Sequence, residues 1–157
     1  MKEQFYIKKA AIQDVPEIHS LLLKFSKQGG ILPRSYSELY SHLRDFFVLV
    51  GRDDSKVVGC CALTITWQNL AEIRSLVVDK PWQKRGWGRR LVDTCLSEAL
   101  TLGIYKVFVL TTNPDFFKKL GFSEISRDLL PQKVWADCMR CPKFPDSCDE
   151  VPMIMEL

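Results

Sequence analysis

The sequence predicts an α/β (α+β) protein with a mixed central sheet of about six to seven strands and helices on both faces. Two observations support this class. Short apolar runs rich in branched residues alternate along the chain with segments whose apolar residues recur at helical spacing. One run, Tyr105 to Thr111, is almost continuously apolar, as expected of a central strand covered on both faces. The length of 157 residues, 46% of them hydrophobic, fits one compact domain over residues 1–157.

The strands are expected wherever such apolar runs lie between turn signals. The clearest pair flanks Asp53-Asp54-Ser55 and predicts a hairpin. The full set of expected strands is Gln4 to Lys9, Phe46 to Arg52, Lys56 to Thr66, Ala71 to Val78, Tyr105 to Thr111, a strand after Gly121-Phe122, and Val151 to Leu157.

The helices are expected where a capping signal precedes helical spacing. Capping-box pairs at Asp14/Glu17 and Ser35/Glu38 predict one helix over about Val15 to Lys27 and a second after Ser35. A third apolar face begins at Leu91 and ends before Gly103, and Asn113-Pro114-Asp115 predicts a cap for a short fourth helix through Leu120. The predicted order is therefore β, α, α, β, β, β, α, β, α, β, β.

The segment between the strand ending at Val78 and the helical pattern at Leu91 has the composition of an anion-binding loop. Its centre reads Gln83-Lys84-Arg85-Gly86-Trp87-Gly88. A helix start leaves backbone NH groups unpaired and carries the positive end of the helix dipole, and glycine lets a ligand approach those donors. Five cations lie within eleven residues, at Lys80, Lys84, Arg85, Arg89 and Arg90. The pattern favours a polyphosphate ligand over an ordinary turn.

The charge distribution argues against two other classes of protein. Net charge is +3, and much of the basic excess lies in this loop, so no nucleic-acid surface is needed to explain it. The N-terminal residues lack the apolar core of a signal peptide, and no apolar run approaches the length that spans a bilayer. We therefore expect a cytoplasmic protein that binds neither nucleic acid nor membrane.

The loop matches Q-x-x-G-x-G at a strand-to-helix junction, and there it resembles the acetyl-CoA loop of the GNAT superfamily of N-acetyltransferases. The predicted order of elements is also that of the GNAT fold. The resemblance implies acetyl-CoA as cofactor, with the pantetheine arm bound by backbone groups of the strand before the loop. The cofactor-binding residues implied are Leu76, Val77, Val78, Gln83, Lys84, Arg85, Gly86, Trp87, Gly88, Arg89, Asn113 and Phe117.

The resemblance also suggests a general base. In several GNAT enzymes a strand glutamate draws the proton from the acceptor amine, and Glu72 stands at the matching position, eleven residues before Gln83. A base of this kind typically contributes about a hundredfold to ten-thousandfold to the rate. The alternative for Glu72 is a structural ion pair with a nearby cation such as Arg74.

The family's usual acid is missing. In the Tyr-x-x-x-Gly-Phe signature, the tyrosine protonates the departing thiolate, but this chain has Phe117-Lys118-Lys119-Leu120-Gly121-Phe122. A phenyl ring cannot donate a proton. The alternatives are another acid, a water molecule, or direct release of the thiolate, whose ordinary pKa near 8.5 makes it a tolerable leaving group.

Three further stretches resemble the acetyltransferase domain of bacterial N-acetylglutamate synthases: residues 30–35, residues 110–113 with 116–117, and residues 130–135. The tail, residues 137–145 and 148–150, is most similar to the short stand-alone form. An acceptor with two carboxylates needs cationic and hydroxyl partners. The substrate-binding residues expected are Arg34, Ser35, Arg74, Thr111 and Thr112. The expected reaction is acetylation of the α-amino group of L-glutamate, the first step of arginine biosynthesis. Alternatives are another small amine or peptide, or a non-catalytic acetyl-CoA sensor. A homodimer is left open.

The six cysteines require a separate interpretation, because thiols stay reduced in the cytoplasm. Cys95 lies on an apolar helix face and is expected in the core. Cys138 and Cys141 have CxxC spacing and Cys148 follows, so three thiolates could form most of a zinc site, but no fourth ligand is evident. Zinc, a disulfide and free thiols remain open for these three, and the predicted reaction itself needs no metal.

Overall fold

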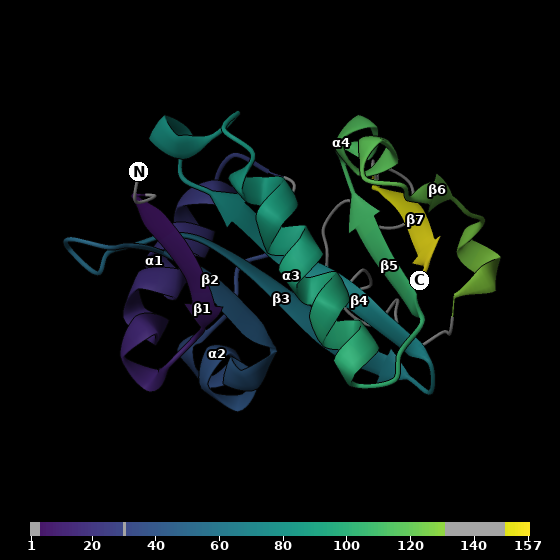
Figure 1. Cartoon of the computed structure of the whole chain (residues 1–157), viewed down its shortest axis with the longest axis horizontal. Coiled ribbons are helices and arrows are strands. Elements are labelled where there is room, and N and C mark those ends of the chain that lie inside the picture. Colours follow the sequence, from purple (N-terminus) through teal and green to yellow (C-terminus); the bar gives the residue numbers. More distant parts are fainter. Residues whose placement is uncertain (1–3, 30, 131–149) are drawn as a thin grey trace.

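The computed structural model describes residues 4–29, 31–130 and 150–157 (Figure 1). Its strands form one seven-stranded sheet in the order β1-β2-β3-β4-β5-β7-β6. Their bounds are β1 Phe5–Lys9, β2 Phe46–Gly51, β3 Val57–Trp67, β4 Leu70–Val78, β5 Lys106–Thr111, β6 Ser123–Glu124 and β7 Val151–Glu156. The α-helices are α1 Val15–Ser26, α2 Tyr36–Ser41, α3 Trp87–Thr101 and α4 Pro114–Lys119. Short 3-10 turns are η1 Ile12–Asp14, η2 Leu43–Asp45, η3 Lys80–Trp82 and η4 Arg127–Leu129.

The sheet is mixed, as predicted. Strands β4 and β5 pair in parallel, and every other neighbouring pair is antiparallel. The expected hairpin joins β2 and β3, with Ser55 at φ 57 in the turn. The last strand in the sequence, β7, inserts between β5 and the two-residue β6. Figure 1 shows β5, β7 and β6 as a separate wing beside the longer β3 and β4.

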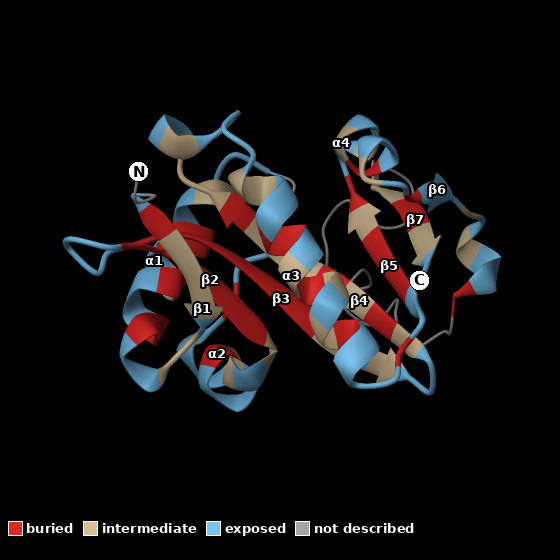
Figure 2. Cartoon of the chain, in the orientation of Figure 1, coloured by how far each residue is buried: buried red, intermediate tan, exposed pale blue. Residues whose placement is uncertain are grey.

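Helices cover both faces of the sheet because the central strands are apolar on both faces. All six residues of β2 are buried (Figure 2), and alternate side chains serve opposite layers: Phe47 and Leu49 pack with α3, whereas Val48 and Val50 pack with α1 and α2. The α3 residues in the first layer are Leu91, Val92, Cys95 and Ala99, and the helical residues in the second are Val15, Ile18, Leu21, Leu22 and Leu39. Cys95 is thus a core residue, as expected.

One of the two predicted capping boxes forms. The Ser35 hydroxyl accepts from the Glu38 backbone NH at 3.1 Å, and Glu38 accepts from the Ser35 NH at 3.4 Å. The prediction for Asp14 and Glu17 is wrong, because other partners take both carboxylates. Asp14 accepts from the Ala11 NH at 2.7 Å and pairs with a lysine of β1, while Glu17 accepts from the first NH of β3 at 2.8 Å.

The helix after the glycine loop begins earlier than its apolar pattern suggests. The sequence predicts a start at Leu91, but α3 begins at Trp87, capped by Gly86 at φ 88. The Arg90 backbone NH donates to the Gly86 carbonyl at 3.1 Å and closes the first turn. The loop therefore supplies the helix start itself. Within the described residues, no helix combines the length and apolarity needed to cross a membrane.

Candidate active site

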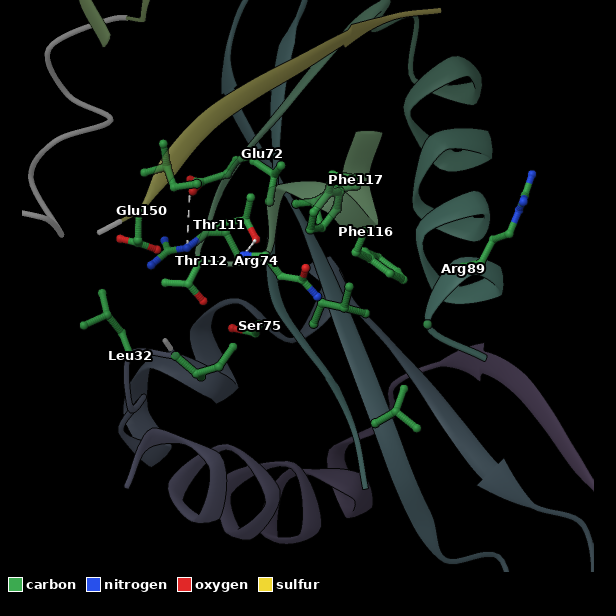
Figure 3. A pocket seen from close by; sticks show the side chains of 18 of the residues that line it. Leu32, Glu72, Arg74, Ser75, Arg89, Thr111, Thr112, Phe116, Phe117 and Glu150 are labelled. Carbon is green, nitrogen blue, oxygen red and sulfur yellow. Dashed lines mark hydrogen bonds and ion pairs between the residues drawn. The ribbon is translucent and has the colours of Figure 1, made fainter. Parts of the chain in front are cut away.

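A cavity of about 580 Å³ lies where β4 and β5 separate (Figure 3). Fourteen of the eighteen predicted site residues line it, from β4, from β5 and the start of α4, from the segment before α2 and from the glycine loop. These are Arg34, Glu72, Arg74, Leu76, Val78, Gln83, Lys84, Gly86, Gly88, Arg89, Thr111, Thr112, Asn113 and Phe117. The structure thus brings together most of the residues that the sequence analysis assigned to cofactor, acceptor and base.

The cavity exists because β4 and β5 are paired over only three residues each. Ala71, Glu72 and Ile73 pair with Val107, Phe108 and Val109, and the two strands then diverge. Beyond Ile73 the edge of β4 that faces β5 is open to a ligand. Strand β3 still holds the other edge of β4, with Val77 opposite Cys60 and Val78 opposite Gly59.

A β-bulge marks the point of divergence. Arg74 pairs with Ala62 and Val77 with Cys60, so Ser75 and Leu76 together oppose the single residue Cys61. Ser75 has φ 56, in the left-handed region that residues with a Cβ rarely enter. The bulge turns the backbone of β4 at the centre of the cavity, beside Glu72 and Arg74.

The glycine loop closes one end of the cavity. Gln83 folds back on β4, its Nε2 donating to the Val78 carbonyl at 2.8 Å, and Lys84 follows at φ 62. A Cβ added at Gly86 would meet no atom within 4 Å, and one added at Gly88 would only touch the Phe116 ring, at 3.4 Å. The first NH groups of α3 therefore face open space at the cavity, which fits a bound pyrophosphate.

Four predicted residues do not line the cavity. The Val77 side chain is buried in the layer under α1, Arg85 lies over the Trp82 ring with its guanidinium carbon 5.3 Å from the ring centroid, and Trp87 packs edge-on against Phe5. The hydroxyl of the fourth, Ser35, is engaged in its capping box. The cofactor and substrate roles expected of the last three side chains gain no support from this geometry, whereas only a backbone role was expected of Val77.

The end of the cavity where the acceptor is expected carries paired charges. Arg74 Nε lies 3.9 Å from Glu72 Oε1, and the two side chains are 22% and 14% exposed. Figure 3 shows the Arg74 guanidinium between the carboxylates of Glu72 and Glu150. Glu150 directly precedes β7, and its backbone carbonyl accepts from Arg127 Nη2 at 2.7 Å. The structural ion pair considered for Glu72 is therefore present, and the same carboxylate also faces the cavity.

Arg34 is a buried cation at the wall of the cavity. It is 6% exposed, and its guanidinium carbon lies 5.3 Å from the centroid of the Phe46 ring. Nearby Asp45 has a pKa raised by burial, which outweighs the opposing effects of its hydrogen bond to Thr64 and of the charges of His42 and Arg34. Arg34 therefore contributes positive charge to a weakly solvated part of the site.

The start of α4 forms the remaining wall. The Asn113 side chain makes no cap hydrogen bond, contrary to the prediction; its backbone NH instead donates to Thr111 Oγ1 at 2.9 Å. Phe117 is 4% exposed and packs edge-on between Phe116 and Phe122, with ring centroids 5.0 Å and 5.3 Å away. A phenyl ring thus stands at the position where the family places its acid.

Sequence reasoning missed several cavity residues. Glu150 and Leu32 lie next to segments with no periodic pattern. Ser75 is distinguished from other strand residues only by the bulge, and Phe116 directly precedes Phe117, the residue at the tyrosine position. Leu32, Phe116 and Glu150 all lie in the stretches that resemble N-acetylglutamate synthases, and this resemblance is the one signal in the sequence that could have identified them. In contrast, Arg89 extends away from the other labelled side chains in Figure 3, with Nε 3.9 Å from Asp93 Oδ2.

The suggested zinc ligands Cys138, Cys141 and Cys148 lie outside the described residues. Among residues 4–29, 31–130 and 150–157, no group of three or more His, Cys, Asp or Glu side chains could hold a metal ion. The described cysteines, Cys60, Cys61 and Cys95, are all free and buried.

The fold and the site define an acetyltransferase of the GNAT class. The Acetyltransferase (GNAT) family profile matches residues 15–122, and the chain belongs to that family. Acetyl-CoA is accordingly its cofactor, and the open strand edge and the glycine-capped start of α3 fit such a ligand.

The relatives narrow the class. The chain is 38% identical to an uncharacterized N-acetyltransferase of Chlorobaculum tepidum, over 96% of both chains, and 34% identical to an amino-acid acetyltransferase of Mycobacterium tuberculosis, over 85% of this chain and 77% of that one. Among solved structures, N-acetylglutamate synthase from Neisseria gonorrhoeae, complexed with coenzyme A and N-acetyl-glutamate, superimposes with a TM-score of 0.87 at 28% identity. All of this chain is covered, but only 36% of the Neisseria chain.

Proposed function

We propose that this acetyltransferase acetylates the α-amino group of an amino acid, with L-glutamate as the preferred acceptor and arginine biosynthesis as the pathway. The observation that carries the proposal is that one cavity contains both the open edge of β4 with the start of α3 and the polar residues Arg34, Arg74, Thr111 and Thr112. Relatives named amino-acid acetyltransferase, and the Neisseria complex with N-acetyl-glutamate, support the same acceptor class.

Binding of the donor follows from the geometry of β4 and α3. Backbone groups of Leu76 to Val78 lie on the strand edge that β5 leaves open, where an extended pantetheine arm can pair with them as an added strand would. Gly86 and Gly88 give the pyrophosphate access to the NH groups of the first turn of α3, and Lys84 adds charge. Asn113, which precedes α4, and Phe117 within it line the same cavity, and we assign them to the thioester end.

The acceptor is held by the charged residues at the opposite end. Arg34 and Arg74 supply two guanidinium groups for the carboxylates of glutamate, and guanidinium grips a carboxylate through two parallel hydrogen bonds. Thr111 and Thr112 supply hydroxyls at the end of β5. The ion pair with Glu72 keeps Arg74 at the wall of the cavity before the acceptor arrives.

Chemistry then requires proton transfer and stabilisation of an oxyanion. Glu72 accepts a proton from the acceptor ammonium, directly or through water, and the free amine nitrogen forms a bond to the thioester carbonyl carbon. Backbone NH groups of the open β4 edge stabilise the oxyanion, since fixed donors reorient little during the reaction. The nitrogen then loses its second proton to water and the carbon–sulfur bond breaks last. The thiolate leaves and takes a proton from water, because Phe117 has none to give.

The substrate assignment is tested by measuring thiol release from acetyl-CoA with L-glutamate, L-glutamine, L-aspartate, a polyamine and a short peptide. We expect the highest kcat/KM for glutamate. Arg74→Gln should raise KM for glutamate by about tenfold or more, the effect of losing one charged hydrogen-bond pair. The charge-matched control Arg44→Gln removes an exposed arginine that does not line the cavity and should leave KM unchanged.

The outcome tests the identity of the acceptor separately from the acetyltransferase activity. A preference for a polyamine, a peptide or another amino acid would discard glutamate and leave acetyl transfer standing. Equal KM values for the Arg74 and Arg44 variants would remove Arg74 from the acceptor site.

A further inference from the structure

Cys60 is a buried thiol that none of the steps above uses. It lies in the middle of β3, fully buried, and belongs to the layer packed under α1 and α2. Its neighbour Cys61 points to the opposite layer, where its sulfur lies 3.6 Å from that of Cys95. Two adjacent thiols on one strand therefore have different surroundings.

The Cys60 thiol bonds to the bulge of β4. Its Sγ donates to the backbone carbonyl of Ser75 at 3.3 Å. Ser75 is the residue at φ 56, and it lies at the step where β4 leaves β5 and lines the cavity. A residue with a side chain holds a left-handed backbone only when its surroundings fix it there. The thiol supplies one such fixing contact.

The surroundings of Cys60 keep this donor intact. Burial raises the pKa of the Cys60 thiol to about 12, so the sulfur retains its proton at physiological pH. The proton is thus held between β3 and the bulge, and it lies in the core, away from the solvent that would compete for it.

We propose that Cys60 is a positioning residue for acetyl transfer: by donating its S–H to the Ser75 carbonyl, it fixes the β4 bulge that aims the open strand edge at the thioester. The Ser75 carbonyl belongs to the same peptide group as the Leu76 NH, which begins the edge assigned to the pantetheine arm. A shift of that peptide group therefore moves the donors that the thioester carbonyl must meet. The inference rests on the proposed use of this edge by acetyl-CoA.

The test compares three variants of adjacent buried thiols. Cys60→Val removes the donor at similar volume, and Cys60→Ser keeps a donor. Cys61→Val makes the same change one residue along, where the side chain packs in the other layer and its sulfur lies beside Cys95 rather than the Ser75 carbonyl. We expect Cys60→Val to lower kcat with acetyl-CoA by about tenfold to a hundredfold, the scale for displaced catalytic groups. Cys60→Ser should stay within about threefold of the native protein, because the hydroxyl also donates. Cys61→Val should change kcat by less than about twofold. Its thermal midpoint should fall by about as much as that of Cys60→Val.

Two further measurements distinguish a positioning role of Cys60 from a packing role, and test separately whether acetyl-CoA uses the open edge of β4. The amide resonance of Leu76 should shift further in Cys60→Val than in Cys61→Val, because only Cys60 bonds to the peptide group of that amide. This shift reports the hydrogen bond without any substrate. Coenzyme A affinity, measured by calorimetry, does not depend on the identity of the acceptor. Equal kcat values for Cys60→Val and Cys61→Val, or a serine variant as slow as the valine variant, would overturn the role of Cys60. If the native protein does not bind coenzyme A, the proposed use of the strand edge fails instead.

Discussion

Replacing Gly86 by alanine isolates the contribution of the loop to cofactor binding. Gly86 is at φ 88, and an added Cβ meets nothing within 4 Å, so the only cost in the folded protein is backbone strain. A residue with a Cβ pays about 1–2 kcal/mol in the left-handed region, and alanine recovers about 0.4–1 kcal/mol through a less flexible unfolded chain. The free energy of unfolding should therefore fall by about 1 kcal/mol, which lowers Tm by about 2–4 °C for a chain of this size.

Gly103 provides a matched control at the other end of the same helix. It has φ 80, and an added Cβ there also meets nothing within 4 Å. Gly103→Ala should lose the same stability, yet it lies outside the cavity. Only Gly86→Ala places a methyl group over the start of α3, so we expect coenzyme A to bind this variant at least about tenfold more weakly, or about 1.4 kcal/mol. Calorimetric titration with coenzyme A measures the difference. Equal affinities for the two variants would refute the assignment of this loop to the pyrophosphate.

The other predictions concern the base, the missing acid and an ion pair beside the loop. Glu72→Gln should lower kcat by about a hundredfold to ten-thousandfold while leaving the dissociation constant of coenzyme A unchanged, and a variant with native turnover would exclude Glu72 as base. Phe117→Tyr should raise kcat by less than about tenfold, because a thiolate already leaves without help; a larger gain in the pre-steady-state rate would show that proton donation limits the native enzyme. Lys24 Nζ lies 2.7 Å from Asp79 Oδ1, and this hydrogen bond is the main reason that the pKa of Asp79 is lowered. A carboxyl group whose pKa is lowered by folding stabilises the fold at pH values above its unfolded pKa of about 4. This stabilisation is lost as the pH falls through the pKa of the folded state. Lys24→Met should therefore cost about 0.2–1 kcal/mol in urea unfolding at neutral pH and almost nothing near pH 2, and an equal loss at both would contradict the assignment.

Local chemistry was enough to predict the elements and most of the cofactor loop. The nearly continuous apolar sequence of Tyr105 to Thr111 indicated a strand covered on both faces, and the central residues of β5 are buried. The Ser35 capping box formed because its partners lie three residues apart and need nothing else. The same spacing failed at Asp14, where Lys8 and the Ala11 NH compete for the carboxylate, and sequence spacing carries no information about such competitors.

The parts that could not be predicted depend on contacts between distant segments. Residues Trp87 to Arg90 have no apolar face of their own, so periodicity placed the helix start at Leu91, although the positive φ of Gly86 begins it at Trp87. The bulge at Ser75 arises from the register of β4 against β3. Glu150 reaches the cavity only because β7, which follows it, returns to pair with β5.

The position of β7 between β5 and β6 also has a consequence for how the protein is made. Strands β1 to β4 and helix α3 carry the open strand edge and the glycine loop proposed to bind the donor. They precede β5 in the chain, and the four strands pair among themselves. The wing of β5, β7 and β6 lacks its middle strand until residues 151–156 have left the ribosome. Because a domain generally folds as a unit, we expect even the half proposed to bind the coenzyme to become stable only once this strand is available. The acceptor side, which includes Glu150, is completed only when that last strand closes the wing.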